Sequence, residues 1–447
     1  MLRRLAASDP ARYPLLLDSA AAGPLGTATV LLAAPRAALW LGADGRLGAD
    51  GVRVEGDTFL GALESWWRRE GAAARPTGAA AQLPFTGGWA LYLGYELAQE
   101  IEPRLALPRT PLPWVAFALR TPGALIHELG TERVLAVAEG TSADTLALLV
   151  ADARAAAARA DPPDTLAFHS VAEEDPEAFL ARVRAAKEYV RAGDIYQANL
   201  SRPWTVAVAG ATPGPGAAAA LYRRLRAANP APFAALAQWR GAALISSSPE
   251  RLVRVCGRRI ETRPIAGTRP RSRSPGGDAV EIPELVAHPK ERAEHIMLVD
   301  LERNDLGRLC EPGTVHVDEL MSIESYVHVH HIVSNVTGTL RADVTPIGAV
   351  RAVFPGGTIT GCPKFRCMQI IAELEGSGRG AYTGSLGYLG RDGQLDLNIL
   401  IRTMTLTGAT LEFRAGAGIV ADSEPERELE ETRAKARGLL RALEVSA

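Results

Sequence analysis

Strand-like and helix-like segments succeed one another along this chain, and that alternation limits the folds it can adopt. Short apolar runs separated by Gly and Pro fill residues 1–150, a pattern typical of strands joined by tight turns. Helical periodicity is clearest over Pro289–Leu306, Cys362–Leu374 and Pro425–Leu443. No fixed-period repeat is present, which argues against a solenoid. With 447 residues, more than the ~250–300 at which one core usually stops growing, the chain is expected to form one large, elaborated α+β body.

A low-complexity stretch at residues 151–165 marks a boundary within this body. It ends in Asp-Pro-Pro-Asp, where proline prevents a helix from continuing. We expect a β-rich N-terminal region over residues 1–160 and a second region over residues 161–447. The second region should include strands at Leu395–Leu406 and Thr410–Ala415.

The segment after Asp175 carries the signals of a complete helix. Asp175 can cap its start, Pro176 suits its first turn, and Gly193 can end it. Phe179 and Val183 fall on one face, so that face is expected to pack against the rest of the protein.

Charge and composition exclude several classes of partner. The chain has 49 Lys and Arg against 51 Asp and Glu, and no basic block could neutralise a run of phosphates, so no nucleic acid is expected to bind. No stretch reaches the ~18 consecutive apolar residues of a membrane helix, so no membrane contact is expected. The four cysteines form no CxxC pair, which fits a reducing, cytoplasmic location.

Two of the predicted helices carry paired acids at their starts. Glu291 and Glu294 are three residues apart, as are Glu428 and Glu431, so each pair shares one helix face. A solvated helix start would explain either pair. If the two faces meet, their carboxylates would suit Mg²⁺, which prefers hard oxygen ligands completed by water and an anionic substrate.

Two glycine-rich segments could hold an anion. Phe354–Lys364 forms a turn that opens a helix, where backbone N–H groups can bind a carboxylate. Its Cys362-Pro363 pair departs from the Lys-Ser/Thr pair of a nucleotide-binding loop. Gly416 and Gly418 match a dinucleotide-binding pattern, but acids follow them where phosphates would need positive charge. Tight turns and close approach to a substrate carboxylate both remain open for these two glycines.

Two polar residues stand inside apolar, strand-like sequence. Arg402 follows Ile401, and a guanidinium in such a place usually has a bidentate carboxylate partner, either internal or on a substrate. His331 shares a strand face with valines, where a histidine is more often a hydrogen-bonded core residue than a catalyst.

Nine stretches together closely resemble the chorismate-utilising enzymes, the family of anthranilate synthase component I, aminodeoxychorismate synthase component I, and the isochorismate and salicylate synthases. The stretches are Tyr196–Leu200, Ser248–Arg251, Arg263–Arg271, Arg292–His295, Asp300–Leu306, His331–Ser334, Phe354–Thr358, Gly384–Tyr388 and Ala415–Ser423. The resemblance covers essentially the whole chain. It implies the fold of anthranilate synthase component I, in which large antiparallel β-sheets pack as a sandwich with helices on the outside. Residues 161–447 would then be the chorismate-binding catalytic region.

The resemblance also implies a metal and a substrate site. Glu294 and Glu431 would bind Mg²⁺ with Glu291 and Glu428 in support, and the metal would hold the ring carboxylate of chorismate. The positions that would contact the substrate are Tyr382, Arg402, Gly416, Gly418, Lys435, Gly267 and Thr268.

Five further positions match the catalytic part of these enzymes. Glu250 matches the general acid that protonates the departing 4-hydroxyl group, a role that needs a pKa raised by burial. His331 and Thr358 match positions beside the reacting ring. Gln197 stands where members that add water carry a lysine base, and because a neutral amide cannot accept a proton from water, amination is expected instead. Ala266 stands where aminodeoxychorismate synthases typically carry a lysine nucleophile.

Two products of amination fit the sequence. Anthranilate synthases have alanine at the position of Ala266, whereas the compact length, Leu83–Ala98 and Tyr196–Leu200 look more like aminodeoxychorismate synthases. We expect 4-amino-4-deoxychorismate, the precursor of p-aminobenzoate and folate, with anthranilate and pyruvate as the alternative. No glutaminase nucleophile pattern accompanies the cysteines, so ammonia should come from a separate glutamine amidotransferase subunit.

Two further expectations concern ligand binding. Leu17, Asp18 and Ser19 resemble part of the family's tryptophan pocket, although Asp18 is one methylene shorter than the usual Glu, so tryptophan is a possible structural or regulatory ligand. A non-catalytic binding protein of the same fold is a remote alternative. Such a protein would have no reason to keep this ensemble of costly polar groups.

Overall fold

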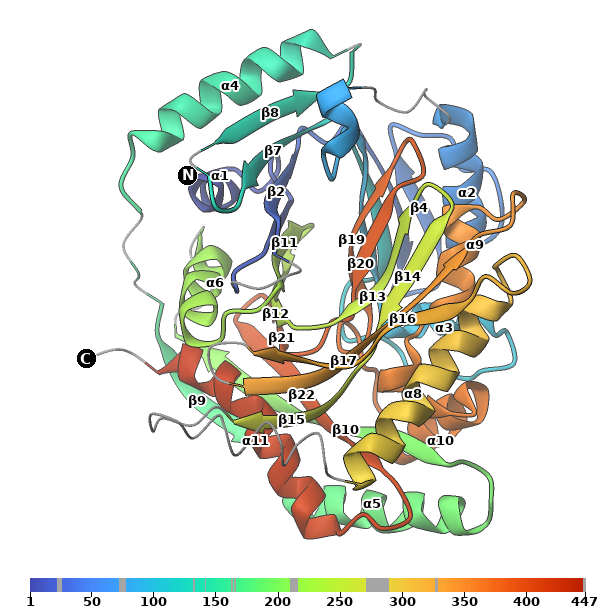
Figure 1. The fold of residues 1–447 in the computed structure, drawn as a ribbon. Coiled ribbons are helices and arrows are strands. Elements are labelled where there is room, and N and C mark those ends of the chain that lie inside the picture. The colour runs from blue at the N-terminus through green and yellow to red at the C-terminus, as the bar shows by residue number, and fades with distance from the viewer. Residues whose placement is uncertain are drawn as a thin grey trace.

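The computed structural model consists of two large β-sheets that pack face to face, with helices on their outer faces (Figure 1). It describes residues 1–21, 26–71, 78–131, 133–140, 142–161, 164, 166–209, 216–270, 289–325 and 329–444. The strand pairs in both sheets are antiparallel. The predicted α+β sandwich is therefore confirmed.

The first sheet contains eleven strands within the described residues. Ten follow one another in space, and β9 (Phe168–Glu173) pairs with β10 beside them. The spatial order is β18 (Gly361–Cys362), β10 (Gln197–Val208), β22 (Thr410–Ile419), β21 (Thr403–Thr407), β12 (Ala242–Ser248), β11 (Phe233–Trp239), β1 (Leu15–Asp18), β2 (Ala28–Ala33), β7 (Gly123–Glu128) and β8 (Val134–Ala138).

The second sheet has the same number of strands in the part of the chain that is described. Here β16 (His316–Ser325) pairs with β17 beside the main path. The spatial order is β15 (Ile265–Pro270), β17 (Val329–Thr339), β14 (Arg259–Arg263), β13 (Arg251–Cys256), β20 (Leu395–Asn398), β19 (Ser385–Gly390), β5 (Gly88–Leu93), β6 (Trp114–Thr121), β3 (Ala37–Gly42) and β4 (Leu47–Asp50).

Strands of both sheets carry apolar side chains on both faces, and each face is covered by the other sheet or by helices. Leu15 of β1 joins Tyr92 and Phe117 of the second sheet in the core between the sheets. The next residue, Leu16, belongs to a second core that lies under the helices outside the first sheet. Successive side chains of a strand point to opposite faces, so a strand covered on both sides reads as a continuous apolar run.

Helices complete the outer layers. A core with residues of α2, α8 and α9 covers the second sheet, whereas α1, α4, α6 and α11 cover the first (Figure 1). The helices are α1 (Leu2–Ser8), α2 (Phe59–Glu70), α3 (Ala98–Ile101), α4 (Ala143–Ala157), α5 (Pro176–Arg191), α6 (Ala217–Ala228), α8 (Pro289–Gly307), α9 (Pro346–Val353), α10 (Lys364–Glu375) and α11 (Pro425–Leu443), with short 3₁₀ turns at Gly78–Gln82, Tyr95–Leu97 and Gly357–Ile359. Over the described ranges, no helix is both long and apolar enough to cross a bilayer.

The predicted helix after Asp175 forms with the expected signals. The Asp175 side chain accepts a hydrogen bond from the backbone N–H of Glu177, and Pro176 is the first residue of α5. Phe179 and Val183 are fully buried. Gly193 follows the helix with a φ of 79°, a backbone conformation that glycine adopts without steric cost.

The prediction of one strand over Leu395–Leu406 is wrong. The segment forms two strands in different sheets, β20 in the second and β21 in the first, and the chain crosses between the sheets at residues 399–402. Arg402 lies in this crossing with a φ of 51°. The apolar run is continuous because both strands and the crossing are packed inside the protein, so its composition could not reveal the break.

The two predicted regions share both sheets. Residues before 160 supply β1 to the first sheet and β5 to the second, where they pair with β11 and β19 from the later region. The two regions therefore pack as parts of one body.

Candidate active site

Most of the predicted site residues line one cavity of about 650 Å³. This central cavity is bounded by strands of both sheets and by α6, α8 and α11. The predicted residues in its wall are Gln197, Glu250, Ala266, Gly267, Glu294, His331, Thr358, Tyr382, Arg402, Gly416, Gly418, Glu428, Glu431 and Lys435. The side chains of Glu291 and Thr268 lie outside the described residues.

Two crossings between the sheets place Glu250 and Arg402 side by side. Glu250 lies between β12 of the first sheet and β13 of the second, and Arg402 lies between β20 and β21, which run the opposite way. The backbone N–H of Ile399 donates to the carbonyl of Glu250 at 3.0 Å, and that of Ser247 donates to the carbonyl of Arg402 at 3.1 Å. The two crossing segments thus hold each other in place.

The Glu250 carboxyl group is suited to donating a proton near neutral pH. Burial raises the pKa of Glu250 to about 7, although the Thr358 hydroxyl, the backbone N–H of Ile265, and the charges of Arg402 and Lys435 all oppose the rise. The hydroxyl of Thr358 donates to Oε1 of Glu250 at 2.8 Å. A carboxyl group with a pKa near the working pH is effective as a general acid.

His331 is held in its neutral form. Burial lowers the pKa of His331 to about 3, and the charge of Arg402 acts in the same direction. His331 lies on β17 opposite Thr268 of β15, where the strand register shifts between Ala266 and Thr268. The bulge exposes Ala266 and Gly267 to the cavity beside the imidazole.

A polar wall forms where β10 and β22 pair. Gln197, Asn199, Gly416 and Gly418 line the cavity there. A Cβ atom on Gly416 would lie 2.6 Å from the Tyr382 hydroxyl and 2.8 Å from Oδ1 of Asn199, and one on Gly418 would lie 2.8 Å from Nε2 of Gln197. A Cβ atom on Gly416 would also lie 2.6 Å from the backbone carbonyl oxygen of Leu200, so glycine is required there, whereas the contact at Gly418 is with the end of the flexible Gln197 side chain.

Lys435 joins this wall to the acids of α11. Its ammonium group donates to the carbonyl oxygen of Gly416 at 2.9 Å and pairs with Glu431 at 2.7 Å. Lys435 and Glu431 are four residues apart, so one helix face carries both groups to the cavity.

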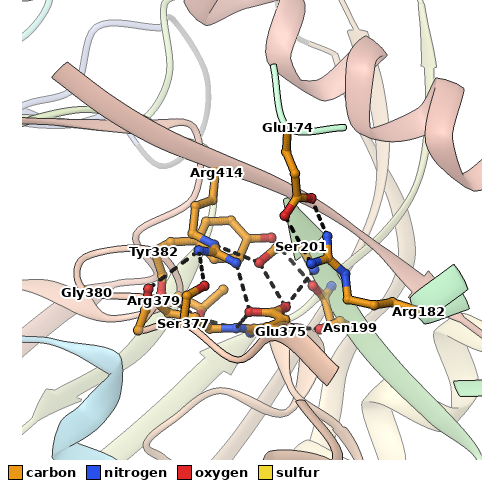
Figure 2. A network of polar contacts seen from close by, with 12 residues as sticks. Glu174, Arg182, Asn199, Ser201, Glu375, Ser377, Arg379, Gly380, Tyr382 and Arg414 are labelled. Carbon is orange, nitrogen blue, oxygen red and sulfur yellow. Dashed lines mark hydrogen bonds and ion pairs between the residues drawn. The ribbon is translucent and has the colours of Figure 1, made fainter. Parts of the chain in front are cut away.

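Beneath this wall lies a buried charge network that the sequence alone did not reveal (Figure 2). Oε1 of Glu375 accepts from the backbone N–H and the hydroxyl of Ser201, at 2.7 and 2.9 Å. Glu375 also pairs with Arg379 at 2.6 Å and with Arg414 at 3.0 Å. One signal was present in the sequence, because Arg414 is a charge within an apolar strand.

Comparison with known proteins shows the family to which the chain belongs. The model of a family described as chorismate binding enzyme matches residues 45–441. This chain belongs to that family.

Relatives of the chain within the chorismate-binding enzymes carry two kinds of name. An anthranilate synthase component I-like protein of a Synechocystis species is 44% identical over 368 residues, which cover 81% of this chain and 74% of that protein. An aminodeoxychorismate synthase of Streptomyces griseus is 38% identical over 417 residues, which cover 90% of this chain and 57% of that protein. The crystal structure of anthranilate synthase component I from Streptococcus pneumoniae superposes with a TM-score of 0.81 at 29% identity, covering 94% of this chain and 93% of that one.

The donor set of the cavity fits the magnesium ion expected for a chorismate-binding enzyme. Glu294 of α8 and Glu428 and Glu431 of α11 reach the cavity from two helices. Among the described residues, no group of three or more His, Cys, Asp or Glu is arranged to hold a metal alone. Mg²⁺ is usually held by one or two carboxylates, with water and an anionic ligand completing its shell, so these acids fit an ion shared with the substrate.

The residues of the predicted tryptophan pocket lie at a second cavity, of about 270 Å³. Leu17, Asp18 and Ser19 line it together with residues of both sheets. The buried Asp18 carboxylate accepts from the hydroxyls of Thr29 and Tyr222, both at 2.9 Å. Asp18 thus has internal partners, and tryptophan binding stays a prediction.

Proposed function

We propose that this chorismate-binding enzyme is an aminodeoxychorismate synthase component I, which converts chorismate and ammonia into 4-amino-4-deoxychorismate and water. The observation that carries amination is Gln197, a neutral amide on the cavity wall where a water-adding enzyme would need a base. Ammonia is nucleophilic when unprotonated and needs no such base. The likeness of Leu83–Ala98 to aminodeoxychorismate synthases, and the Streptomyces griseus relative that matches 90% of the chain, favour this product.

Glu250 supplies the proton that the leaving group needs. Ammonia attacks ring carbon 2, the ring double bond shifts, and the 4-hydroxyl departs as water with the proton of Glu250. A second substitution then places nitrogen on carbon 4 and releases the first amine. The Thr358 hydroxyl orients the carboxyl group of Glu250 throughout.

Mg²⁺, when bound by Glu294 and Glu431 with Glu428 and Glu291 beside them, would neutralise the ring carboxylate of chorismate. Tyr382, Arg402, Gly418 and Lys435 would hold the substrate carboxylates against the opposite walls. A glutamine amidotransferase subunit would supply the ammonia.

Anthranilate synthase component I is the second candidate, and Ala266 favours it. Ala266 lines the cavity with a methyl group, so no lysine nucleophile is present at that position and no covalent adduct should form there. Elimination of pyruvate after the first amination would give anthranilate. The names of relatives such as the Synechocystis protein support this reading.

Incubation with chorismate, Mg²⁺ and ammonium separates the candidates by product. Conversion of the product to p-aminobenzoate by an added lyase supports the proposal. Fluorescent anthranilate without added lyase supports the second candidate. Unchanged chorismate contradicts both and leaves a binding protein of the same fold. Co-purification with candidate glutaminase subunits tests the amidotransferase partner.

A further inference from the structure

The charge network beneath the cavity wall has one carboxylate for two guanidinium groups. Arg379 and Arg414 both pair with Glu375, and within the described residues neither guanidinium has a second ion-pair partner. The neighbouring carboxyl group, Glu96, accepts from the backbone N–H groups of Arg379 and Gly380, at 2.6 and 3.1 Å, and burial raises its pKa against the charge of Arg379, so its ionised form is disfavoured. Glu375 therefore balances only one of the two positive charges.

Arg414 is the member of the network that reaches the cavity. Its side chain is 9% exposed, against 1% for Glu375 and for Arg379, and it lines the central cavity. Arg414 lies within β22, two residues before Gly416, so the two residues share one face of the strand. The unbalanced charge thus lies beside the backbone at Gly416 and the hydroxyl of Tyr382.

Hydrogen bonds fix the position of this guanidinium. Nε of Arg414 donates to the hydroxyl of Ser201 at 3.0 Å, and Nη1 donates to the hydroxyl of Ser377 at 3.2 Å (Figure 2). Arg379 fixes the neighbouring strand by donating to the carbonyl oxygen of Asn199 at 2.6 Å. The charge is therefore held in place before a ligand arrives, and little side-chain freedom is lost on binding.

We propose that Arg414 is a specificity-determining residue, whose unbalanced charge makes the wall of Tyr382 and Gly416 select ligands that carry a second carboxylate. This inference rests on the proposed function, in which Mg²⁺ neutralises the ring carboxylate and leaves the other carboxylate of chorismate to this wall. Without Arg414, the second carboxylate would lose an attractive charge in a largely buried place, where screening by water is weak.

The test compares two ligands that differ in that carboxylate. The dicarboxylate is 3-(1-carboxyethoxy)benzoate and the monocarboxylate is 3-ethoxybenzoate, and the Kd of each is measured by calorimetry in the presence of Mg²⁺. Arg414→Gln should weaken the dicarboxylate about tenfold and change the monocarboxylate less than about twofold, as expected for loss of one nearby charge. Arg414→Lys, which keeps the charge, should restore most of the difference. The KM for chorismate should rise in Arg414→Gln with kcat little changed.

Folding is controlled in two ways. Arg414→Gln removes one partner of the buried Glu375 but leaves the Glu375–Arg379 pair, so the variant should fold with a lowered thermal transition. Arg202→Gln removes a fully buried guanidinium, paired with Glu173, that does not line the cavity. It should lower stability without changing the ratio of the two Kd values.

Equal weakening of both ligands by Arg414→Gln, or weakening of neither, would overturn the inference. Its failure is distinguishable from failure of the proposed function. If the wild-type protein binds the dicarboxylate with Mg²⁺ and the variant binds it equally well, only the role of Arg414 is wrong. If the wild-type protein binds neither ligand, the proposed chorismate site is wrong and the inference falls with it.

Discussion

Removal of the Thr358 hydroxyl should move the pH dependence of the reaction upwards. The hydroxyl donates to the buried Glu250 carboxylate at 2.8 Å and so favours the ionised form, which lowers the pKa. Hydrogen bonds to charged groups contribute about 1.5–3 kcal/mol, and part of that is kept with a protonated acid. Since one pKa unit corresponds to about 1.4 kcal/mol, Thr358→Val should raise the pKa of Glu250 from about 7 by roughly one unit.

The assay is the pH profile of kcat/KM for chorismate, which reports the pKa of the acid in the free enzyme. Free ammonia is held constant at each pH by adjusting total ammonium, because ammonium itself titrates in the alkaline range. Activity should fall as the pH rises through the pKa of Glu250, and in Thr358→Val this fall should lie about one unit higher. The matched control is Thr360→Val, which removes a buried hydroxyl that donates to the carbonyl of Gly356 in the same turn. An unchanged or lowered midpoint in Thr358→Val would refute the assignment of Glu250 as the acid.

Three other changes test the site. Glu250→Gln should unfold at higher denaturant concentration than the wild type at pH 8 but not near pH 5. The reason is that folding raises the pKa of Glu250 from 4.5 to about 7, so the free energy of unfolding of the wild type falls by about 3 kcal/mol as the pH rises between these values. Glu294→Gln should lose activity together with its dependence on Mg²⁺, because it removes a charged hard ligand, and full activity in a Mg²⁺ titration would contradict the metal assignment. Gly416→Ala should raise the KM for chorismate more than about tenfold, because its Cβ would displace the Tyr382 hydroxyl, whereas Gly307→Ala, with open space around it, should leave kinetics unchanged.

Local signals made the helices predictable from the sequence. Capping at Asp175 and the periodicity of Pro425–Leu443 each depend on residues within a few turns of one another, and both helices have the predicted bounds or nearly so. The acids of α8 and α11 were predicted to share faces for the same reason. That Glu294, Glu428 and Glu431 face one cavity depends on contacts between segments more than a hundred residues apart, which spacing alone could not show.

Ion pairs between distant segments could not be predicted from local sequence patterns. Arg414 and Glu375 are 39 residues apart and meet only because α10 packs against β10 while β22 pairs with it. The crossing at Arg402 was not predicted because apolar composition indicates that a segment is buried but not in which sheet its strands lie. The resemblance to known enzymes supplied a role for Arg402 but none for Arg414 or Glu375. The product, the amidotransferase partner, the cytoplasmic location and tryptophan binding stay predictions.

The sharing of both sheets sets a limit on how this protein can be cut or grafted. A fragment beginning at residue 161 would keep β11 and β19 but lose β1 and β5, so each sheet would end in a long apolar edge with unpaired backbone groups. Such edges recruit strands from other copies and favour aggregation. We therefore expect that residues 161–447 do not fold as an independent module, and that two separate fragments form a stable protein only when they are produced together.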